Sequence, residues 1–505
     1  MHRLAELDHR YVWHPFTQMR DWLKAEPILL VRGKGAVLRD VYGRAYLDAN
    51  SSIWTNLHGH NHSKINAAIQ KQLRKVAHSA ALGFANEPAS LLAEKLVEAA
   101  NPDFVRRRRR QEQMDLTLAK SRRSQSPVAL APRLQKVFFS DDGSTAMEVA
   151  LKLAYEYARR TGRSQRPRFL SLQGAYHGDS VGAVSLGHID LFHKAYRGLL
   201  FKSDPVMAPY CYRCPFNRAQ PERADAREYR RCNWECIDKV EQRFAAQRKK
   251  GNPYAALIVE PLIQGAAGMI PQPQGWLNKV SQIARADGAQ LIADEVMTGF
   301  GRTSFSTAST LNPRCSTSLF ACHEEQVQPD FLALAKGLTG GYLPMAATLT
   351  TQAVFDAFLG DYAEFKTFFH GHSYTGNQLG AAAALASLDI LSTPASIRVR
   401  QKLQKTLRTE LQTLWTLPNV GDIRQVGLIV GVELVNDWRT RKPFELSERA
   451  GIRVCEAMAR RGVLTRPIGN VVVLMPPYCT TERQATDIVS VLREAVTEVF
   501  AMSKL

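Results

Sequence analysis

Short apolar stretches alternate with helix-like stretches through most of the middle of this chain. Apolar segments typical of buried strands occur at residues 136–140, 169–172, 256–260, 290–293 and 331–335. Helix-like stretches separate most of these segments, as the crossover between two parallel strands requires. The alternation therefore predicts an α/β protein with a mostly parallel sheet that is covered by helices on both faces.

The flanking segments indicate three parts. Residues 1–60 form an aromatic-rich arm with a hairpin-like piece at 37–48, which we expect to belong to a small domain. Residues 61–395 form the large domain, and residues 396–505 are typical of a smaller α+β unit. Helices are predicted at 64–78, 88–100, 146–154, 398–416, 446–461 and 481–500, and further strands at 424–435 and 463–475.

The chain is strongly basic, because 66 Lys and Arg residues face 47 Asp and Glu residues, a formal net charge of +19. Residues 101–135 alone hold nine Lys and Arg and three acids, a net charge of +6. This run is polar, lacks a helical period and ends in a Ser- and Pro-rich stretch, which is typical of a solvated insertion. A nucleic-acid patch is the alternative, but no recognition motif accompanies it, so we expect no nucleic-acid partner.

Nothing in the sequence indicates a membrane protein. No run approaches the roughly 18 apolar residues of a membrane span. The N-terminal residues 1–9 lack the apolar core of a signal peptide. We therefore expect a cytoplasmic protein.

Four of the eight cysteines have a suggestive spacing. Cys211 and Cys214 are separated by two residues, and Cys232 and Cys236 by three. Two close pairs of thiols can hold a structural zinc ion. The looser second spacing and the lack of a supporting histidine favour ordinary reduced cysteines, so we expect no metal there.

One lysine follows the last apolar segment of the sheet. Lys336 comes directly after residues 331–335 and is followed by the glycine-rich residues 337–341. Removing an amine from water lowers its pKa and makes it a better nucleophile, as Schiff-base chemistry with a carbonyl or with pyridoxal phosphate requires. A surface lysine at a strand end is the simpler interpretation of this position alone.

Three other strand ends carry distinctive residues, and ligands of such sheets bind beyond the carboxyl ends of the strands. Gly143 and Ser144 open a helix, whose N-terminus can bind a phosphate, although an ordinary helix cap explains them equally well. Tyr176 precedes His177 and can stack on a flat heteroaromatic ring. Asp294 ends a buried strand and can pair with a protonated pyridine nitrogen.

Two alternatives involve other chemistries. Residues 291–295 resemble a Walker B element, but the chain has no Gly-x4-Gly-Lys-Ser/Thr loop, which argues against a nucleotide hydrolase. The imidazoles of the HGHNH stretch at 58–62 suggest a metallohydrolase, but no matching carboxylate-and-histidine set follows at the strand ends. We interpret this stretch as a tight structural turn.

Taken in chain order, these residues resemble the class III pyridoxal-phosphate aminotransferases. The matching stretches are HPFTQM at 14–19, SSIW at 51–54, HGHNH at 58–62, YHGD at 176–179, EPLIQGA at 260–266, DEVMTGFGR at 294–302, FHGHSYTGN at 369–377 and LTRP at 464–467. They cover nearly the whole chain outside the insertions. The resemblance implies a fold-type I homodimer with pyridoxal phosphate at the subunit interface.

The resemblance also implies roles for individual residues. Lys336 would carry the cofactor and move the proton, and Asp294 would hold its pyridine nitrogen. Phosphate contacts would come from Gly143 and Ser144, and from His372 and Ser373 of the other subunit. Tyr176 would pack over the ring, Arg466 would clamp the carboxylate of the keto substrate, and the substrate site would be lined by Trp54, Arg302 and Gly371.

Within the family, the resemblance is strongest to the branch that aminates 8-amino-7-oxononanoate in biotin biosynthesis. The S-adenosylmethionine-using members usually have two adjacent tryptophans where this chain has Ile53-Trp54, and commonly a tyrosine where Phe16 stands. A lysine-using branch has an aliphatic residue before the tryptophan, so both amino donors stay open. A second insertion around 303–318 lengthens the Asp294–Lys336 separation to 42 residues. The alternatives are a class III enzyme for an ω-amino acid or diamine, a nucleic-acid-associated protein and a zinc-stabilised hydrolase.

Overall fold

A seven-stranded sheet forms the centre of the protein. The computed structural model describes residues 1–105, 132–304 and 318–501, so the arginine run at 106–110 and most of the 303–318 insertion lie outside the described residues. The strand order is β4-β12-β11-β10-β7-β5-β6. Only β12 runs against its neighbours, which confirms the mostly parallel sheet. The strands are β4 Leu134–Ser140, β5 Arg168–Leu172, β6 Asp204–Val206, β7 Tyr254–Val259, β10 Gln290–Asp294, β11 Phe331–Leu334 and β12 Ala346–Thr351.

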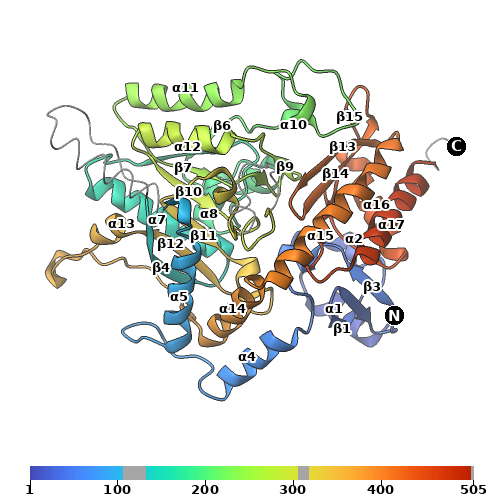
Figure 1. Ribbon diagram of the computed structural model, residues 1–505, viewed down its shortest axis with the longest axis horizontal. Helices are drawn as coiled ribbons and strands as arrows, with labels where there is room; N and C mark the ends of the chain where they lie inside the picture. The colour runs from blue at the N-terminus through green and yellow to red at the C-terminus, as the bar shows by residue number, and fades with distance from the viewer. Residues whose placement is uncertain (106–131, 305–317, 502–505) are drawn as a thin grey trace.

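Helices cover both faces of this sheet, as the alternation along the chain predicts (Figure 1). Ile258 and Ile292 belong to the apolar cluster formed with α7 Gly143–Arg160. Their neighbours Leu257 and Leu291 belong to the cluster on the opposite face. Because successive strand side chains point to opposite faces, each buried strand contributes to two cores. The second core is completed by α5 Glu87–Ala99, α11 Glu235–Lys249, α12 Trp276–Ala286 and α14 Gln378–Leu391.

The two ends of the chain pack together beside the large sheet. An N-terminal sheet has the order β1-β2-β3-β16, in which β16 comes from the C-terminal region and runs parallel to β3. A second sheet has the order β13-β14-β18-β17, with β15 also paired to β14. The domain boundaries at residues 60 and 395 stay predictions. The strands are β1 Leu30–Lys34, β2 Val37–Asp40, β3 Ala45–Asp48, β13 Val420–Val426, β14 Ile429–Asp437, β15 Lys442–Pro443, β16 Val463–Leu464, β17 Pro467–Ile468 and β18 Val471–Leu474.

The remaining elements are short, apart from the C-terminal helices. The longer helices are α1 Arg3–Tyr11, α4 Ser63–Leu73, α15 Pro394–Leu411, α16 Ala450–Arg460 and α17 Glu482–Ala501. The short ones are α2 Met19–Trp22, α3 Ser51–Trp54, α8 Val181–Leu186, α9 Asp190–His193, α10 Ala226–Tyr229, α13 Gln352–Asp356, and the 3₁₀ turns η1 Lys194–Leu199, η2 Cys211–Arg213, η4 Ala321–Glu325, η5 Lys336–Thr339, η6 Tyr362–Glu364, η7 Gln412–Thr416 and η8 Leu446–Glu448. A two-stranded ribbon joins β8 Ile263–Gln264 to β9 Ile270–Pro271.

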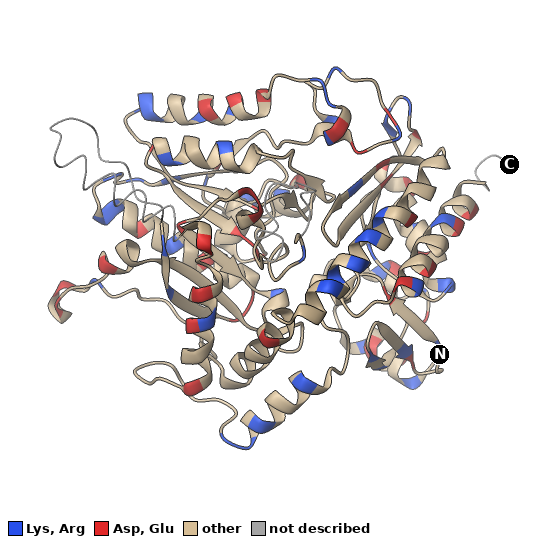
Figure 2. Cartoon of the chain, in the orientation of Figure 1, with Lys and Arg blue, Asp and Glu red and all other residues tan. Residues whose placement is uncertain are grey.

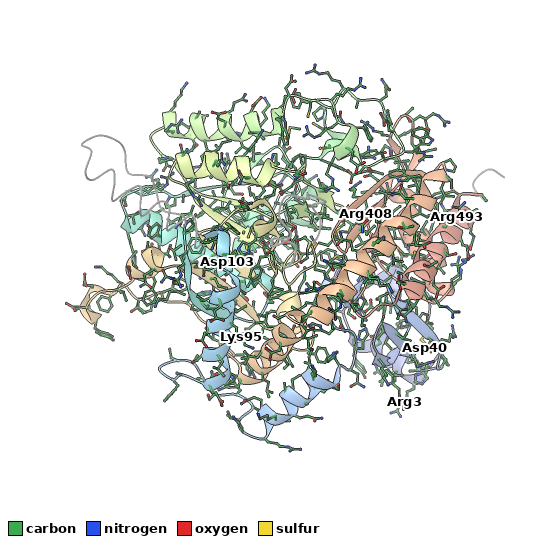
Figure 3. All side chains as sticks on the ribbon, viewed as in Figure 1. Arg3, Asp40, Lys95, Asp103, Arg408 and Arg493 are labelled. Atoms are coloured by element: carbon green, nitrogen blue, oxygen red, sulfur yellow. The ribbon has the colours of Figure 1, made fainter. Side chains whose placement is uncertain are left out.

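Charged residues of both signs are interspersed over α11 and α17, whereas α15 carries mainly basic ones (Figure 2). Surface ion pairs join neighbouring elements, and one of them connects Lys95 of α5 (labelled in Figure 3) to Asp389 of α14. Arg493 of α17, also labelled there, donates a hydrogen bond of 2.7 Å to the carbonyl oxygen of Thr413.

No single helix among the described residues is long and apolar enough to cross a membrane. The helices Gln378–Leu391 and Pro394–Thr416 reach the required length and composition only when they are taken together as a bent pair.

Candidate active site

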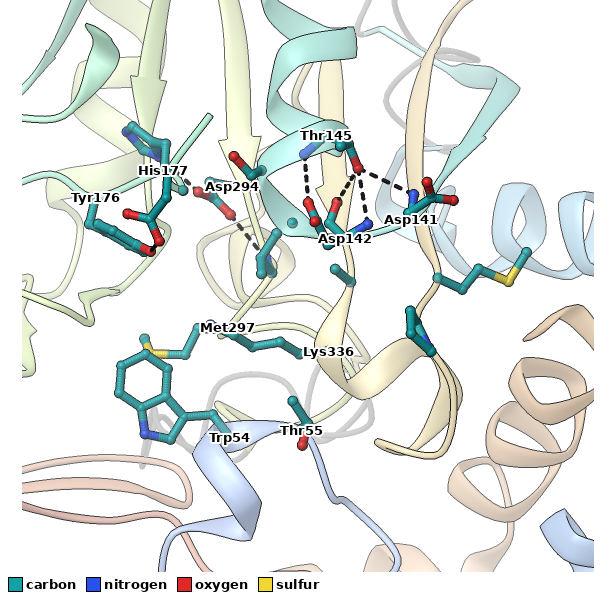
Figure 4. Close-up of a pocket in the computed structure, with 18 of the residues that line it drawn as sticks. Trp54, Thr55, Asp141, Asp142, Thr145, Tyr176, His177, Asp294, Met297 and Lys336 are labelled. Atoms are coloured by element: carbon teal, nitrogen blue, oxygen red, sulfur yellow. Dashed lines mark hydrogen bonds and ion pairs between the residues drawn. The ribbon is translucent and has the colours of Figure 1, made fainter. Parts of the chain in front are cut away.

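A cavity of about 620 Å³ opens beyond the carboxyl ends of the central strands (Figure 4). It receives side chains from segments that are far apart in the sequence. Six of the residues predicted from the sequence line it together: Trp54, Gly143, Ser144, Tyr176, Asp294 and Lys336. The prediction that the lysine, the acid and the helix N-terminus share one cavity is therefore confirmed.

Lys336 begins the turn η5 directly after β11, and its backbone has a φ of 41°. This left-handed conformation is rare for a residue with a Cβ atom and is typical of functional sites. Its side chain crosses the cavity beside Met297, and Nζ lies 4.6 Å from the centre of the Trp54 ring (Figure 4). Removal from water lowers the pKa of the Lys336 amine, although Asp294 and Glu260 act in the opposite direction.

Asp294 ends β10 and is 5% exposed. Its Oδ2 lies 2.7 Å from Nδ1 of His177, and its Oδ1 accepts a hydrogen bond of 3.1 Å from the Val296 amide. The buried His177 therefore fixes the orientation of a carboxylate that a strand end already holds in place. A buried acid with one fixed partner can stabilise a cationic group that enters the cavity.

Glu260 directly follows β7, at the same end of the sheet as Asp294 at the end of β10, and it also lines the cavity. Burial raises the pKa of the Glu260 carboxyl to about 7, while the facing His177 and two amide hydrogen bonds act against this rise. The amides of Gly265 and Tyr176 donate to it at 2.8 and 3.3 Å. The sequence predicted no role for Glu260 beyond its place in a matching stretch. Its position at the end of a predicted buried strand, 256–260, is the same signal that identified Asp294.

Tyr176 is held at the cavity wall by its hydroxyl, which donates to Oδ2 of Asp179 at 2.7 Å. Burial raises the pKa of this phenol further above its ordinary value, so the ring stays neutral. The Tyr176 ring is stacked on the imidazole of His193, with 6.4 Å between the ring centres. The ring position is therefore fixed before any ligand enters.

The N-terminus of α7 forms another wall of the cavity. Asp142 caps this helix, because its carboxylate accepts a hydrogen bond of 2.8 Å from the Thr145 amide. A Cβ atom at Gly143 would lie 2.6 Å from Cγ1 of Val296, so glycine is required for this close approach. Capping therefore engages the Asp142 carboxylate with the helix.

The second residue of α7 is tied to the loop that carries Tyr176. Ser144 Oγ donates to Ser180 Oγ at 2.6 Å and accepts from the Ser180 amide at 2.8 Å. Ser180 Oγ in turn donates to Oε1 of Glu148 at 2.7 Å. This chain of hydrogen bonds fixes the helix N-terminus relative to the aromatic wall.

Trp54 reaches the cavity from an unusual turn. All four residues of α3 have left-handed backbone angles, with φ between 46° and 68°. Each such residue costs about 1–2 kcal/mol. Asp48 holds the turn by accepting from the amides of Asn50 and Ser52, and the Trp54 indole donates to Oδ1 of Asn50 at 2.9 Å. No pattern of residue types announces this turn.

The other predicted site residues are not among the described residues that line the cavity. Arg302 is 1% exposed, lies over the Tyr478 ring and donates to the Pro476 carbonyl oxygen at 2.9 Å. Arg466 is exposed, as are Gly371 and Ser373. His372 Nδ1 lies 3.6 Å from the carboxylate of Asp141, at the rim of the cavity. The roles of these five residues stay predictions.

The histidines at 58–62 make contacts within the fold. His58 is buried with Nε2 2.9 Å from Ser387 Oγ, and His60 Nε2 lies 3.0 Å from Oδ2 of Asp48. These contacts support the interpretation of a structural turn and tie it to the acid that holds the left-handed turn of Trp54.

The aminotransferase class-III family matches residues 19–496 of this chain. The chain belongs to this family, whose members bind pyridoxal phosphate, and its fold-type I architecture agrees with that of the solved members. It is 42% identical to the adenosylmethionine-8-amino-7-oxononanoate aminotransferase of Geobacter sulfurreducens over 493 residues, covering 98% of this chain and 97% of the relative.

Solved structures give the same picture. The crystal structure of the adenosylmethionine-8-amino-7-oxononanoate aminotransferase of Methanocaldococcus jannaschii has 38% identity, a TM-score of 0.82 and 98% coverage of both chains. An amine transaminase from an uncultivated Pseudomonas species, solved in its PLP-bound form, has 32% identity and a TM-score of 0.80, covering 96% of this chain and 98% of that one.

The cavity fits pyridoxal phosphate. Its volume lies in the usual range for small-molecule sites, about 300–1,000 Å³. The amides of a helix N-terminus suit a phosphate, a buried carboxylate suits a pyridinium, and an amine kept from water suits a carbonyl carbon. The N-terminus of α7, Asp294 and Lys336 supply these three groups.

Proposed function

We propose that this enzyme transfers an amino group to 8-amino-7-oxononanoate, forming 7,8-diaminononanoate for biotin synthesis. The observation that carries the proposal is identity over the full length: relatives with the name of this activity are 42%, 44% and 42% identical over at least 97% of this chain. The ω-transaminase structures from Pseudomonas jessenii are 26% identical.

Lys336 has the central role in this proposal. When bound, pyridoxal phosphate stores the amino group between the two substrates and withdraws electrons from the reacting carbon. Lys336 would hold the cofactor, and its Nζ would accept and return the proton of the reacting carbon. The lowered pKa of the Lys336 amine supports this role, because a neutral amine can accept a proton.

The walls of the cavity orient and shield the reacting groups. Asp294, oriented by His177, keeps the pyridine nitrogen protonated. Gly143 and Ser144 bind the phosphate at the positive end of α7. Tyr176 and Trp54 exclude water from either side of the Lys336 amine, which strengthens the electrostatic interactions inside.

The proposal includes a homodimer in the cytoplasm, with His372 and Ser373 completing the phosphate site of the other subunit. Arg466 clamps the carboxylate of the keto acid, for which a planar guanidinium is suited. Arg302 and Gly371 contribute to the substrate site.

The amino donor is S-adenosylmethionine or lysine. A single indole, that of Trp54, stands where two tryptophans would offer a larger surface for a sulfonium. A second candidate function is amine transfer to or from an ω-amino acid or diamine, which the similarity to the Pseudomonas amine transaminase favours.

Turnover of the purified enzyme with 8-amino-7-oxononanoate and a panel of amino donors tests the proposal. We expect product with S-adenosylmethionine or with lysine, and weak or no product with simple ω-amines. Absence of product with both donors, together with rapid turnover of a diamine, would favour the second function.

A further inference from the structure

The four cysteines at 211–236 line one small, enclosed cavity. Cys211 begins η2 and Cys214 directly follows it, whereas Cys232 precedes α11 and Cys236 lies in its first turn. Two short sections of the chain, separated by 17 residues, thus bring two thiols each to the same place. In Figure 1 the connecting stretch with α10 crosses the top of the view between α11 and β15.

One hydrogen-bond donor in this cavity is directed at a sulfur atom. Arg230 Nη1 donates to Sγ of Cys232 at 3.2 Å, whereas the Asn217 amide donates to the carbonyl oxygen of Cys214 at 3.1 Å. The Nε atom of Arg230 is buried without a partner among the described residues, and the guanidinium lies over the Trp234 ring at 4.0 Å. A neutral thiol is a weak acceptor, so a cationic donor of this kind is suited to a thiolate.

Thiolates need a compensating cation at this position. Cys211 is 7% exposed and Cys236 is 8% exposed, so water cannot offset the charge of a thiolate at either position. Arg230 alone can balance one thiolate but not four. A divalent cation that prefers sulfur ligands would balance the remaining charge.

The connecting segment buries little apolar surface of its own. Its own apolar cluster consists of Cys211, Tyr212 and Ala226, with two partly buried tyrosines packed against it. Its regular structure is limited to η2 and α10. Segments that bury so little apolar surface usually depend on a metal or a disulfide.

We propose that Cys211, Cys214, Cys232 and Cys236 bind one structural zinc ion. The four thiols release four protons to solvent and form four Zn–S bonds, and Arg230 offsets part of the net charge of −2. Among the described residues no three possible ligands already surround a common point. The thiols would therefore rotate towards the ion from backbone positions that already share one cavity, to distances of about 2.3 Å.

The site would fasten this segment to the C-terminal sheet. Arg213, between the first two cysteines, donates to Oε1 of Glu433 on β14 at 2.7 Å. Arg223 donates to the carbonyl oxygen of Leu417 at 2.9 Å. Zinc would thus stabilise the contact between the large sheet and the C-terminal sheet, at a distance from the reacting groups.

Metal analysis of the purified holoenzyme tests the proposal. After growth in zinc-supplemented medium, we expect about one zinc per chain. Cys214→Ser and Cys232→Ser should each lose most of it, while the matched control Cys479→Ser, outside the cluster, should retain it. All proteins should keep the absorbance of bound pyridoxal phosphate, which shows that the fold is intact.

Titration of the wild-type holoenzyme with a mercurial reagent gives a second measurement, in case the serine variants fail to fold. Zinc release should follow the modification of about four thiols, and a strong chelator should lower the melting temperature. Three results would each overturn the proposal. The wild-type protein could stay free of zinc after reconstitution with zinc, or both serine variants could keep their full zinc content. The third is a mass lower by about 2 or 4 Da, which indicates disulfides.

Discussion

The cavity that holds Lys336 and Asp294 and the small cavity lined by the four cysteines are built in opposite ways. The first draws its residues from the ends of long buried strands, and its key side chains are fixed by hydrogen bonds such as His177–Asp294. The second draws its residues from an irregular segment with almost no apolar core. A rigid sheet can hold an amine and acids without a ligand, whereas an irregular segment depends on what its thiols bind.

The largest expected effect is that of Lys336→Ala. Activity should fall at least about 10⁴-fold, because the proton acceptor and the covalent link are lost together. The absorbance band of the lysine-linked cofactor near neutral pH should disappear, and zinc content should not change. An unchanged band would show that another lysine carries the cofactor. The exposed Lys95→Ala serves as the control.

Asp294→Asn should reduce the turnover number by about 10²–10³-fold, since a fixed charge that stabilises the reacting state is removed. The variant should retain cofactor, because the α7 cradle and Lys336 are intact. His177→Gln should cause a smaller loss by leaving Asp294 less well oriented. If the two variants are equally impaired, orientation rather than charge is the main contribution of the pair.

Glu260→Gln should change the pH dependence of stability. The pKa of Glu260 is raised by burial from 4.5 to about 7, so its stabilising contribution is complete below pH 4.5 and is lost as the pH rises through 7. Between pH 5 and 8 the free energy of unfolding of the wild type should fall by about 2–3 kcal/mol relative to the variant.

Urea unfolding of both proteins at several pH values measures this difference. Glu295 has its pKa raised to about 7 as well, but it is present in both proteins and cancels. Parallel pH profiles would mean that Glu260 is ionised in the folded protein at pH 5.

The smallest expected effect is that of Trp54→Leu. The variant keeps an apolar wall but loses the ring 4.6 Å from the Lys336 amine, a contact of about 0.5–2 kcal/mol. We expect an increase of roughly 3- to 30-fold in KM for a cationic donor, and Trp54→Phe should restore most of it. A collapse of the turnover number instead would show that the left-handed turn itself had been disrupted.

The predictable part of the molecule is its regular part. The strands that end at Asp294 and before Lys336 were located within one residue, because buried strands carry unbroken apolar runs. The helix predicted at 481–500 was located equally well, whereas the predicted starts of α15 and α16 were each wrong by four residues. Glu260 was given no role from the sequence, although it follows a strand of the same kind. The roles of Arg302, Gly371, His372, Ser373 and Arg466 came only from resemblance.

The sequence by itself determined five of the seven strands of the central sheet, and with them the edge at which an amine, an acid and a helix N-terminus meet. Only the tertiary structure decided that a left-handed turn brings Trp54 to that edge, and that four cysteines from two separate sections of the chain line one cavity. Periodicity reports which side of an element is buried, whereas the path of an irregular segment depends on contacts with residues far away in the chain.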